Sequence, residues 1–369
     1  MAHLLIWSSL AFLLYVHFGY PMLLDVWRRV AGRPVKKGSW EPTTSSASAF
    51  AWPTVSILIA VHNERDTIEA KLQNCLQLDY PAEKLQIVVA LDAPTDGTDA
   101  IVAGFDSAMV SSVKLLHHKG KAGALNHAVV AARGDILVFA DARQSFDHSA
   151  LRELVANFYD PEVGCASGEL VLLDENGREA SDAVGIYWRY EKWMRAQEAE
   201  IHSMLGATGA IYAIRRELYK AMPPDTILDD MLIPMSIVLD GKRAVFDGAA
   251  RAYDRVSASP ECEYGRKVRT LMGNYQLLAR MPGLLSPFHN PVWLQFMSHK
   301  VARLLVPYFM MVLFVANLCA LDGAYVWLFV AQCCWYLLAG VGGFLSRQSP
   351  VREVSPVSIA AMSTKREGS

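Results

Sequence analysis

The sequence has few cysteines and no excess of positive charge, and both absences narrow the range of functions. Its six cysteines form no C-x-x-C pair, so their spacing indicates neither a zinc site nor a disulfide framework. The net charge of -2 gives no reason to expect a nucleic-acid partner. The chain also lacks a Gly-x-Gly-x-x-Gly turn after its first predicted strand, where it has Val61-His62-Asn63-Glu64. This argues against a nicotinamide-dependent oxidoreductase.

Long apolar runs stand near both ends of the chain and raise its mean hydropathy to +0.18, which is high for a soluble enzyme. Residues 4–24 contain no Asp, Glu, Lys or Arg, and their length matches the roughly 20 residues that cross the hydrocarbon core of a bilayer. A cleaved signal peptide is the alternative, but no Lys or Arg precedes the run and no small-x-small site follows it. We therefore predict an N-terminal transmembrane helix over residues 1–27.

Two further apolar runs, 304–321 and 324–345, are separated by Asp322-Gly323 and predict a transmembrane helical hairpin over residues 304–346. Basic residues flank these runs: Arg28 follows the first run, Arg303 precedes the second, and Arg347 follows the third. By the positive-inside rule these flanks are cytoplasmic. The predicted order is then a linker at 28–52, a cytoplasmic domain at 53–285, an interfacial helix at 286–303 and a cytoplasmic tail at 347–369. A buried amphipathic helix fits residues 286–303 equally well.

The central part of the chain alternates short β-branched runs with helical stretches, which predicts an α/β fold. The predicted strands are residues 55–61, 86–91, 113–116 and 136–140. The predicted helices between and after them are residues 66–76, 98–105, 122–132 and 147–159. Near-continuous apolar strands of this kind indicate a mostly parallel sheet that is covered by helices on both faces.

Polar residues follow three of these strands. His62, Asn63 and Glu64 follow the first strand, Asp92 ends the second, and Asp141 follows the fourth. Open α/β sheets bind ligands at the carboxyl ends of their strands. Asp92 and Asp141 are therefore interpreted as ligand-facing, whereas Asp96-Gly97 is better explained as a turn before a helix.

Two other segments carry chemistry. Lys119 and Lys121 alternate with glycines directly before a predicted helix, where free backbone N–H groups and the helix dipole attract phosphate. A solvated helix entry is the alternative for this segment. Downstream, Asp230 is a candidate general base, and Asp229 is interpreted as the N-cap of the helix that follows. Gly209 would let an acceptor approach the backbone closely.

Seven segments support a family resemblance: VSILIAVHNE, ALDAPTDGT, HKGKAGALNHA, FADAR, TGAIYAIRR, LDDM and GRKVRTLMGN. Their order and spacing resemble the family 2 inverting glycosyltransferases, in particular the membrane-bound bacterial branch with cellulose, hyaluronan and poly-N-acetylglucosamine synthases. The resemblance covers about residues 55–305. It implies the GT-A nucleotide-diphospho-sugar transferase fold, a UDP-sugar donor, a glycan or lipid-linked acceptor, and a place in the bacterial inner membrane.

The resemblance also implies roles for individual residues. Asp92 would contact the uridine of the donor, and Lys119 and Lys121 would lie near its diphosphate or sugar. Asp141 matches the first acid of the D-x-D motif, which orients the sugar nucleotide and its Mg²⁺ or Mn²⁺ ion. Asp230 matches the catalytic base.

Further matches concern the acceptor side and the diphosphate. Gly209 and Tyr212 fall in the segment that forms part of the acceptor site in the family, although Tyr212 taken alone is more typical of a core. Arg266 and Arg269 correspond to the Gln-x-x-Arg-Trp element and would together grip the diphosphate.

Two departures limit the resemblance. Arg143 stands at the third position of D-x-D, so that the cation would depend chiefly on the diphosphate for its ligands. Thr270 replaces the tryptophan of Gln-x-x-Arg-Trp, which weakens the expectation of processive synthesis.

The sequence thus predicts a membrane-anchored glycosyltransferase that uses a cytoplasmic UDP-sugar for a surface or exported glycan. Membrane lipids surround it. Because three spans are few for a glycan channel, either a lipid-linked acceptor or a partner subunit for export is expected. The alternative is a catalytically degenerate scaffold that binds nucleotide within a synthase complex, and Arg143 favours it.

Overall fold

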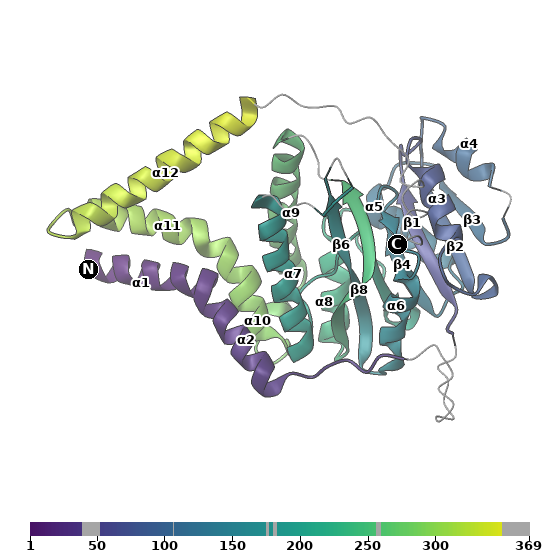
Figure 1. The fold of residues 1–369 in the computed structure, drawn as a ribbon, viewed down its shortest axis with the longest axis horizontal. Helices are drawn as coiled ribbons and strands as arrows, with labels where there is room; N and C mark the ends of the chain where they lie inside the picture. The colour runs from purple at the N-terminus through teal and green to yellow at the C-terminus, as the bar shows by residue number, and fades with distance from the viewer. Residues whose placement is uncertain (39–51, 106, 175–176, 180–182, 256–259, 349–369) are drawn as a thin grey trace.

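The computed structural model describes residues 1–38, 52–105, 107–174, 177–179, 183–255 and 260–348 (Figure 1). Most of the predicted linker at 28–52 and nearly all of the predicted tail at 347–369 lie outside the described residues. The N-terminal helical region consists of α1 (Ala2–Leu14) and α2 (Tyr20–Ala31), which are joined by a π-helical turn. It ends at Ala31, four residues after the predicted end at 27.

The described residues of the central domain form an eight-stranded mixed sheet with the order β3-β2-β1-β4-β7-β6-β8-β5. One half is parallel and consists of β1 (Val55–Val61), β2 (Leu85–Asp92), β3 (Val110–Leu115) and β4 (Ile136–Ala140). The other half consists of β5 (Ser145–Phe146), β6 (Val163–Leu173), β7 (Ile211–Arg215) and β8 (Arg243–Arg255). Strand β7 is antiparallel to β4 and β6, while β6 and β8 run parallel.

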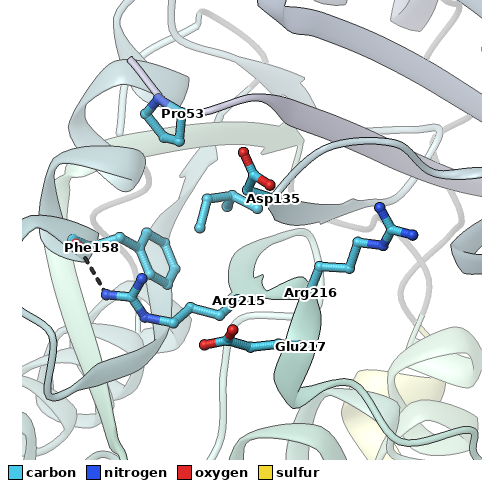
Figure 2. Close-up of a pocket in the computed structure, with 7 residues that line it drawn as sticks. Pro53, Asp135, Phe158, Arg215, Arg216 and Glu217 are labelled. Atoms are coloured by element: carbon cyan, nitrogen blue, oxygen red, sulfur yellow. Dashed lines mark hydrogen bonds between the residues drawn. The ribbon is translucent and has the colours of Figure 1, made fainter. Parts of the chain in front are cut away.

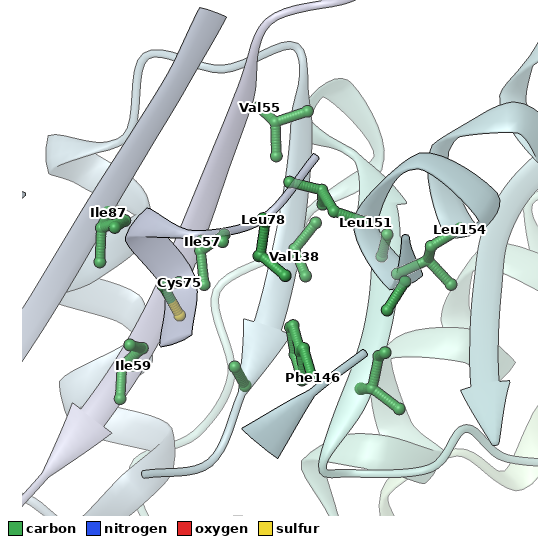
Figure 3. Packing of buried hydrophobic residues seen from close by; sticks show 14 of the residues in the cluster. Val55, Ile57, Ile59, Cys75, Leu78, Ile87, Val138, Phe146, Leu151 and Leu154 are labelled. Carbon is green, nitrogen blue, oxygen red and sulfur yellow. The ribbon is translucent and has the colours of Figure 1, made fainter. Parts of the chain in front are cut away.

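Helices cover both faces of the sheet, as the apolar strands require. On one face, α3 (Ile68–Leu76) and α6 (Ala150–Ala156) pack on alternate strand residues such as Ile57, Ile87 and Val138 (Figure 3). On the other face, α5 (Gly120–Ala131) and α8 (Asp229–Leu239) cover the intervening residues, including Leu58 and Phe139. The short α4 (Thr98–Ala103) lies after β2. This packing fixes the carboxyl ends of β1, β2 and β4 along one edge.

Within the described ranges, three helical regions are long and apolar enough to cross a membrane: Ala2–Ala31, Trp293–Leu318 and Tyr325–Gly343. They contain α1 and α2, α10 (Trp293–Phe296) with α11 (Ala302–Leu318), and α12 (Tyr325–Gln348). Figure 1 shows α1, α11 and α12 extending from one side of the sheet domain. The rings of Phe12 and Phe309 stack with centroids 3.9 Å apart, which joins the first helix to α11.

The helices α7 (Ala183–Ile201) and α9 (Pro260–Arg280) lie between the sheet and the apolar helices (Figure 1). Tyr20 and Leu24 of α2 are buried against Met194 and Ile201 of α7. The segment 293–301 is continuous with α11 and carries the buried residues Phe296 and His299. The interfacial helix at residues 286–303 stays a prediction.

Candidate active site

Acidic side chains from three separate parts of the chain meet near the carboxyl ends of β2 and β4, and Lys121 links two of these parts. Its Nζ atom lies 2.8 Å from Oδ1 of Asp141 and 3.5 Å from Oδ2 of Asp229. Gly120, with φ of +73°, supplies the left-handed backbone that begins α5 and directs the next residue into the site. The structure thus brings Lys121, Asp141 and the acidic pair of α8 together.

Asp92 lies at the end of β2 and is buried, with 3% of its surface exposed. Its Oδ1 atom accepts a hydrogen bond of 2.7 Å from the backbone N–H of Lys119, and its Oδ2 atom lies 2.9 Å from Nδ1 of His118. The ring of His62 lies 4.4 Å from that of His118 and donates from Nδ1 to the carbonyl oxygen of Asp92. Asp92 therefore holds the loop before α5 against the ends of β1 and β2.

Of the two lysines in this segment, Lys119 differs from the expectation that its side chain lies in the site. Lys119 reaches the site through its backbone, while its Nζ atom lies 3.5 Å from Nε2 of His127 along α5. The sequence analysis did not assign His62 and His118 to the site. Their positions could have indicated it, because His62 directly follows β1 and His118 directly precedes Lys119.

The electrostatics of Lys121 follow from its neighbours. Burial by itself lowers the pKa of this lysine, but the carboxylates of Asp229 and Asp141 raise it well above its ordinary value. Lys121 is therefore a permanent cation at neutral pH. A fixed positive charge between two carboxylates is suited to the diphosphate of a nucleotide sugar.

Asp230 and Asp229 begin α8 but lie in different surroundings. Asp229 is buried, and its Oδ2 atom accepts a hydrogen bond of 3.3 Å from the hydroxyl of Tyr212. Its interpretation as the N-cap was wrong, because Leu228 caps the helix and Asp229 is the first helical residue. The half-buried Asp230 is held by its backbone oxygen, which accepts a hydrogen bond of 2.7 Å from the N–H of Ala207.

Burial and the neighbouring charge of Asp229 raise the pKa of Asp230 to about 6, against the opposing effect of Lys121 and Arg195. A carboxylate with a pKa near the working pH is suited to general-base catalysis. A Cβ atom on Gly209 would lie 3.1 Å from Oδ2 of Asp230, so the glycine leaves room directly beside this carboxylate.

Tyr212 requires a correction. Its side chain is fully buried, and its ring stacks on Phe139 with centroids 4.5 Å apart. A buried ring cannot touch an acceptor, so the assignment of Tyr212 to the acceptor side was wrong. It acts instead from behind the site through its hydroxyl bond to Asp229.

Arg143, the departure from D-x-D, is turned toward the sheet. Its guanidinium group forms an ion pair with the buried Asp254 near the end of β8, which also accepts a hydrogen bond of 2.9 Å from Gln144. Beneath the same turn, buried Lys71 donates to the carbonyl oxygen of Gln144 at 2.8 Å. Asp254 and Lys71 were also missed, since only the fold brings them under this turn.

The residues at this turn fit a divalent cation that is coordinated by one protein carboxylate. Asp141 is half-exposed, with its Oδ1 atom paired to Lys121, and among the described residues no group of three or more His, Cys, Asp or Glu side chains is arranged as a metal site. Such a cation would take its other ligands from the diphosphate and water, as Mg²⁺ does at many phosphate sites.

Arg266 and Arg269 lie on α9, in a stretch that is exposed. Farther along the same helix, Gly273 packs on Leu228, and the side chain of Gln276 accepts a hydrogen bond of 3.0 Å from the N–H of Ile227. These contacts bring α9 beside the beginning of α8. The grip of the two arginines on a diphosphate remains a prediction.

A cavity of about 430 Å³ lies at the opposite end of the strands (Figure 2). Its lining includes Pro53 before β1, Asp135 before β4 and Arg215 at the end of antiparallel β7. The guanidinium group of Arg215 points toward Phe158 and donates to its carbonyl oxygen at 2.9 Å. This cavity is therefore separate from the acidic residues described above.

The sheet topology and the acidic edge place the protein in the class of GT-A folds. In accord with this, the structure resembles mannosyltransferase PcManGT from Pyrobaculum calidifontis, solved with GDP-Man and Mn²⁺, with a TM-score of 0.69 and 23% identity. The likeness covers 94% of this chain and 96% of that one.

Residues 56–222, a little less than half of the chain, match the model of glycosyl transferase family 2. The chain is 26% identical over 245 residues to a poly-beta-1,6-N-acetyl-D-glucosamine synthase of Staphylococcus aureus. It is 27% identical over 177 residues to a beta-monoglucosyldiacylglycerol synthase of Synechocystis sp.. These matches cover 61% and 47% of this chain, but only 56% and 35% of the respective relatives.

Proposed function

We propose that the protein transfers a sugar from a UDP-sugar to a hydroxyl group of a glycan or lipid-linked acceptor, with inversion at the anomeric carbon. The observation that carries the proposal is the placement of Asp230, which lies against Gly209, where a side chain would crowd its carboxylate, and within the field of Lys121. Inversion requires one base on the face of the sugar opposite the leaving diphosphate. Asp230 supplies this base, and Lys121 receives the charge of the departing UDP.

The other site residues bind the donor. Asp141 would hold a Mg²⁺ or Mn²⁺ ion together with the diphosphate, and this ion supplies charge neutralisation when bound. Opening of the contact between Asp92 and His118 would free the carboxylate of Asp92 for the uridine. Arg266 and Arg269 would reach the diphosphate from α9.

Three apolar helices support association with a membrane, and we place the protein in the bacterial inner membrane with its catalytic domain in the cytoplasm. One named relative makes a polysaccharide and the other makes a glycolipid. Both products are compatible with an acceptor that is presented at the membrane surface. A partner subunit for export belongs to the polysaccharide case.

The alternative of a degenerate scaffold rests on Arg143, but this arginine is paired with Asp254 and leaves Asp141 accessible. The two proposals are separated by measuring the release of UDP, or of GDP from GDP-mannose, by the full-length protein in bacterial lipid nanodiscs. The panel contains several UDP-sugars and GDP-mannose, each with and without Mn²⁺.

We expect UDP release with at least one donor, and we expect Asp230→Asn to lower kcat by about 10²- to 10⁴-fold, the usual contribution of a general base. Asp240→Asn is the matched control, because Asp240 lies at the other end of the same helix and pairs with Lys220. UDP binding without turnover would support the scaffold. Full activity of Asp230→Asn would contradict the proposed mechanism.

A further inference from the structure

Arg195 on α7 is absent from the motifs discussed above, yet it reaches the acceptor side of the site. Its Nη1 atom donates a hydrogen bond of 2.6 Å to Oγ1 of Thr208, the residue before Gly209. Its guanidinium carbon lies 6.0 Å from the ring centroid of Phe246, which borders its other side. Among the described residues, Arg195 forms no ion pair with a carboxylate within 4.0 Å.

The hydroxyl that Arg195 holds is a fixed point of the turn beside Asp230. Thr208 Oγ1 donates to the carbonyl oxygen of Gly168 at 2.9 Å, and the N–H of Thr208 donates to Oγ of Ser167 at 2.7 Å. The bond from Arg195 uses an acceptor position that remains on this hydroxyl. Thr208 is therefore tied to β6 on one side and to α7 on the other, while Gly209 stays against Asp230.

The helix that carries Arg195 is itself held by the membrane-proximal helices. Glu191, Arg195 and Glu198 follow each other at helical spacing and share one face of α7. Glu198 accepts a hydrogen bond of 2.7 Å from the hydroxyl of Tyr20, and its Oε1 atom also lies 2.7 Å from Nδ1 of His299. Glu191 forms an ion pair with Arg303 at the beginning of α11.

We propose that Arg195 is a positioning residue for the transfer reaction, which holds the Thr208-Gly209 turn against Asp230 and places a positive charge on the acceptor side of this base. The inference rests on the proposed function, because it takes Asp230 as the base. The charged groups that face Asp230 are Asp229 on α8, Lys121 on α5, Asp141 after β4 and Arg195 on α7. Of the two cations, Arg195 is the one bonded to the Thr208-Gly209 turn, whereas Lys121 is paired with Asp141 and Asp229.

The test compares Arg195→Gln, Arg195→Lys and Thr208→Val in the full-length protein in nanodiscs, using the donor that is active in the assay above. Arg195→Gln is expected to lower kcat by about 10- to 100-fold, the loss that a small misplacement of reacting groups causes. The KM for the donor and the affinity for its free nucleotide stay unchanged. The acid limb of the pH profile moves to higher pH, because loss of a nearby cation disfavours the ionised carboxylate.

Arg195→Lys is expected to restore the acid limb toward its original position, since it restores the charge. Thr208→Val is expected to lower kcat without moving the limb, because it removes the hydroxyl and keeps the cation. The matched control is Arg189→Gln, an exposed arginine on the same helix, which is expected to behave as the unaltered protein. A merely structural role of Arg195 would lower nucleotide binding and kcat together and leave the limb in place.

The outcomes separate this inference from the proposed function. If Asp230→Asn keeps full activity, the proposed function fails and the inference fails with it. If Asp230→Asn is inactive while Arg195→Gln keeps the kcat and pH profile of the unaltered protein, the inference alone is overturned. Should Arg195→Gln not fold, as judged by lost nucleotide binding, Thr208→Val decides, and an unaltered kcat in that variant overturns the proposal.

Discussion

At the scale of single residues, the charge around Asp230 determines when the site is active. Two carboxylates, Asp229 and Asp141, raise the pKa of Asp230 in addition to burial, and two cations, Lys121 and Arg195, lower it. Because the opposing charges come from four different segments, the pKa of this base depends on the whole arrangement. A general base must be ionised before it can accept a proton.

The pH profile of the transfer follows from this balance. With a pKa of about 6, Asp230 is protonated below that pH, so we expect kcat/KM to fall as the pH decreases through 6. The decrease approaches tenfold for each pH unit, and the rate is constant above the limb until another group titrates. Initial rates between pH 4.5 and 8, with the fold checked by tryptophan fluorescence, measure it. A profile that stays flat down to pH 4.5 would contradict a base of this kind.

Single residues were predictable where a motif and a strand end coincide. Asp141 follows an uninterrupted apolar strand, and Lys121 lies in the first turn of α5 directly after Gly120, so local sequence was sufficient to place both residues at the ends of elements. Arg195 and Asp254 were not predictable, because each is polar within an ordinary helix or strand and acquires its role only through contacts with distant residues. Tyr212 was misplaced for the same reason, since strand β7 turns alternate residues to opposite faces and the sequence does not tell which face meets the acceptor.

At the scale of elements, β6 and β8 lie close together at Gly168. The pairing of β6 with β8 shifts in register between Gly168 and Glu169 of β6. The carbonyl oxygen of Gly168 accepts a hydrogen bond from the hydroxyl of Thr208. A Cβ atom at Gly168 would lie 2.3 Å from the backbone oxygen of Ala250. Only glycine lets the two strands remain at this distance.

Gly168→Ala is therefore expected to destabilise the protein by about 1–3 kcal/mol, the range for overpacked sites. It is also expected to reduce activity, because the clash displaces the anchor of Thr208. Thermal unfolding of the purified protein measures the first effect. Gly248→Ala is the matched control on β8, where the added atom would be no closer than 3.7 Å to its neighbours. Equal melting temperatures for the two variants would show that the strands relax apart freely.

Elements were predicted best where a segment is buried on both faces. The bounds of β1 and β4 agree with the predicted 55–61 and 136–140, because uninterrupted β-branched runs mark central parallel strands. The edge strand β3 (Val110–Leu115) was shifted, since its half-exposed residues alternate weakly with polar ones. The pairing of β7 between β4 and β6 could not be foreseen, because it joins segments far apart in the chain.

At the scale of the whole molecule, buried polar groups join the sheet domain to the helices that carry the apolar surface. Glu198 of α7 is almost fully buried and is satisfied by Tyr20 from α2 and His299 from the segment before α11. Loss of a hydrogen-bond partner lowers the free energy of unfolding more for a buried carboxylate than for an exposed one. The attachment of the first helix therefore depends on few hydrogen bonds.

Tyr20→Phe tests this attachment. The variant keeps the ring and removes the hydroxyl that donates to Glu198 at 2.7 Å, so we expect a loss of about 1–3 kcal/mol in the free energy of unfolding. Thermal unfolding in detergent, followed by intrinsic fluorescence, measures it. Tyr275→Phe is the control, because the hydroxyl of exposed Tyr275 lies 3.3 Å from that of exposed Tyr308, so that its bond is accessible to water. A destabilisation as large in the control would mean that Tyr20 has no special role.

Strand β8 reaches from the attachment of the first helix to the donor side of the sheet. It begins at Arg243, whose guanidinium group donates to the carbonyl oxygens of Arg33 at 2.7 Å and Ala199 at 3.0 Å, and it includes Asp254, which holds Arg143. Inserting or deleting one residue in a strand reverses the facing of every later side chain. Such a change between Arg243 and Asp254 would leave the bond between Arg243 and Arg33 intact, but it would turn Asp254 away from Arg143. In related chains, differences in length should therefore accumulate in loops and leave this span of β8 untouched.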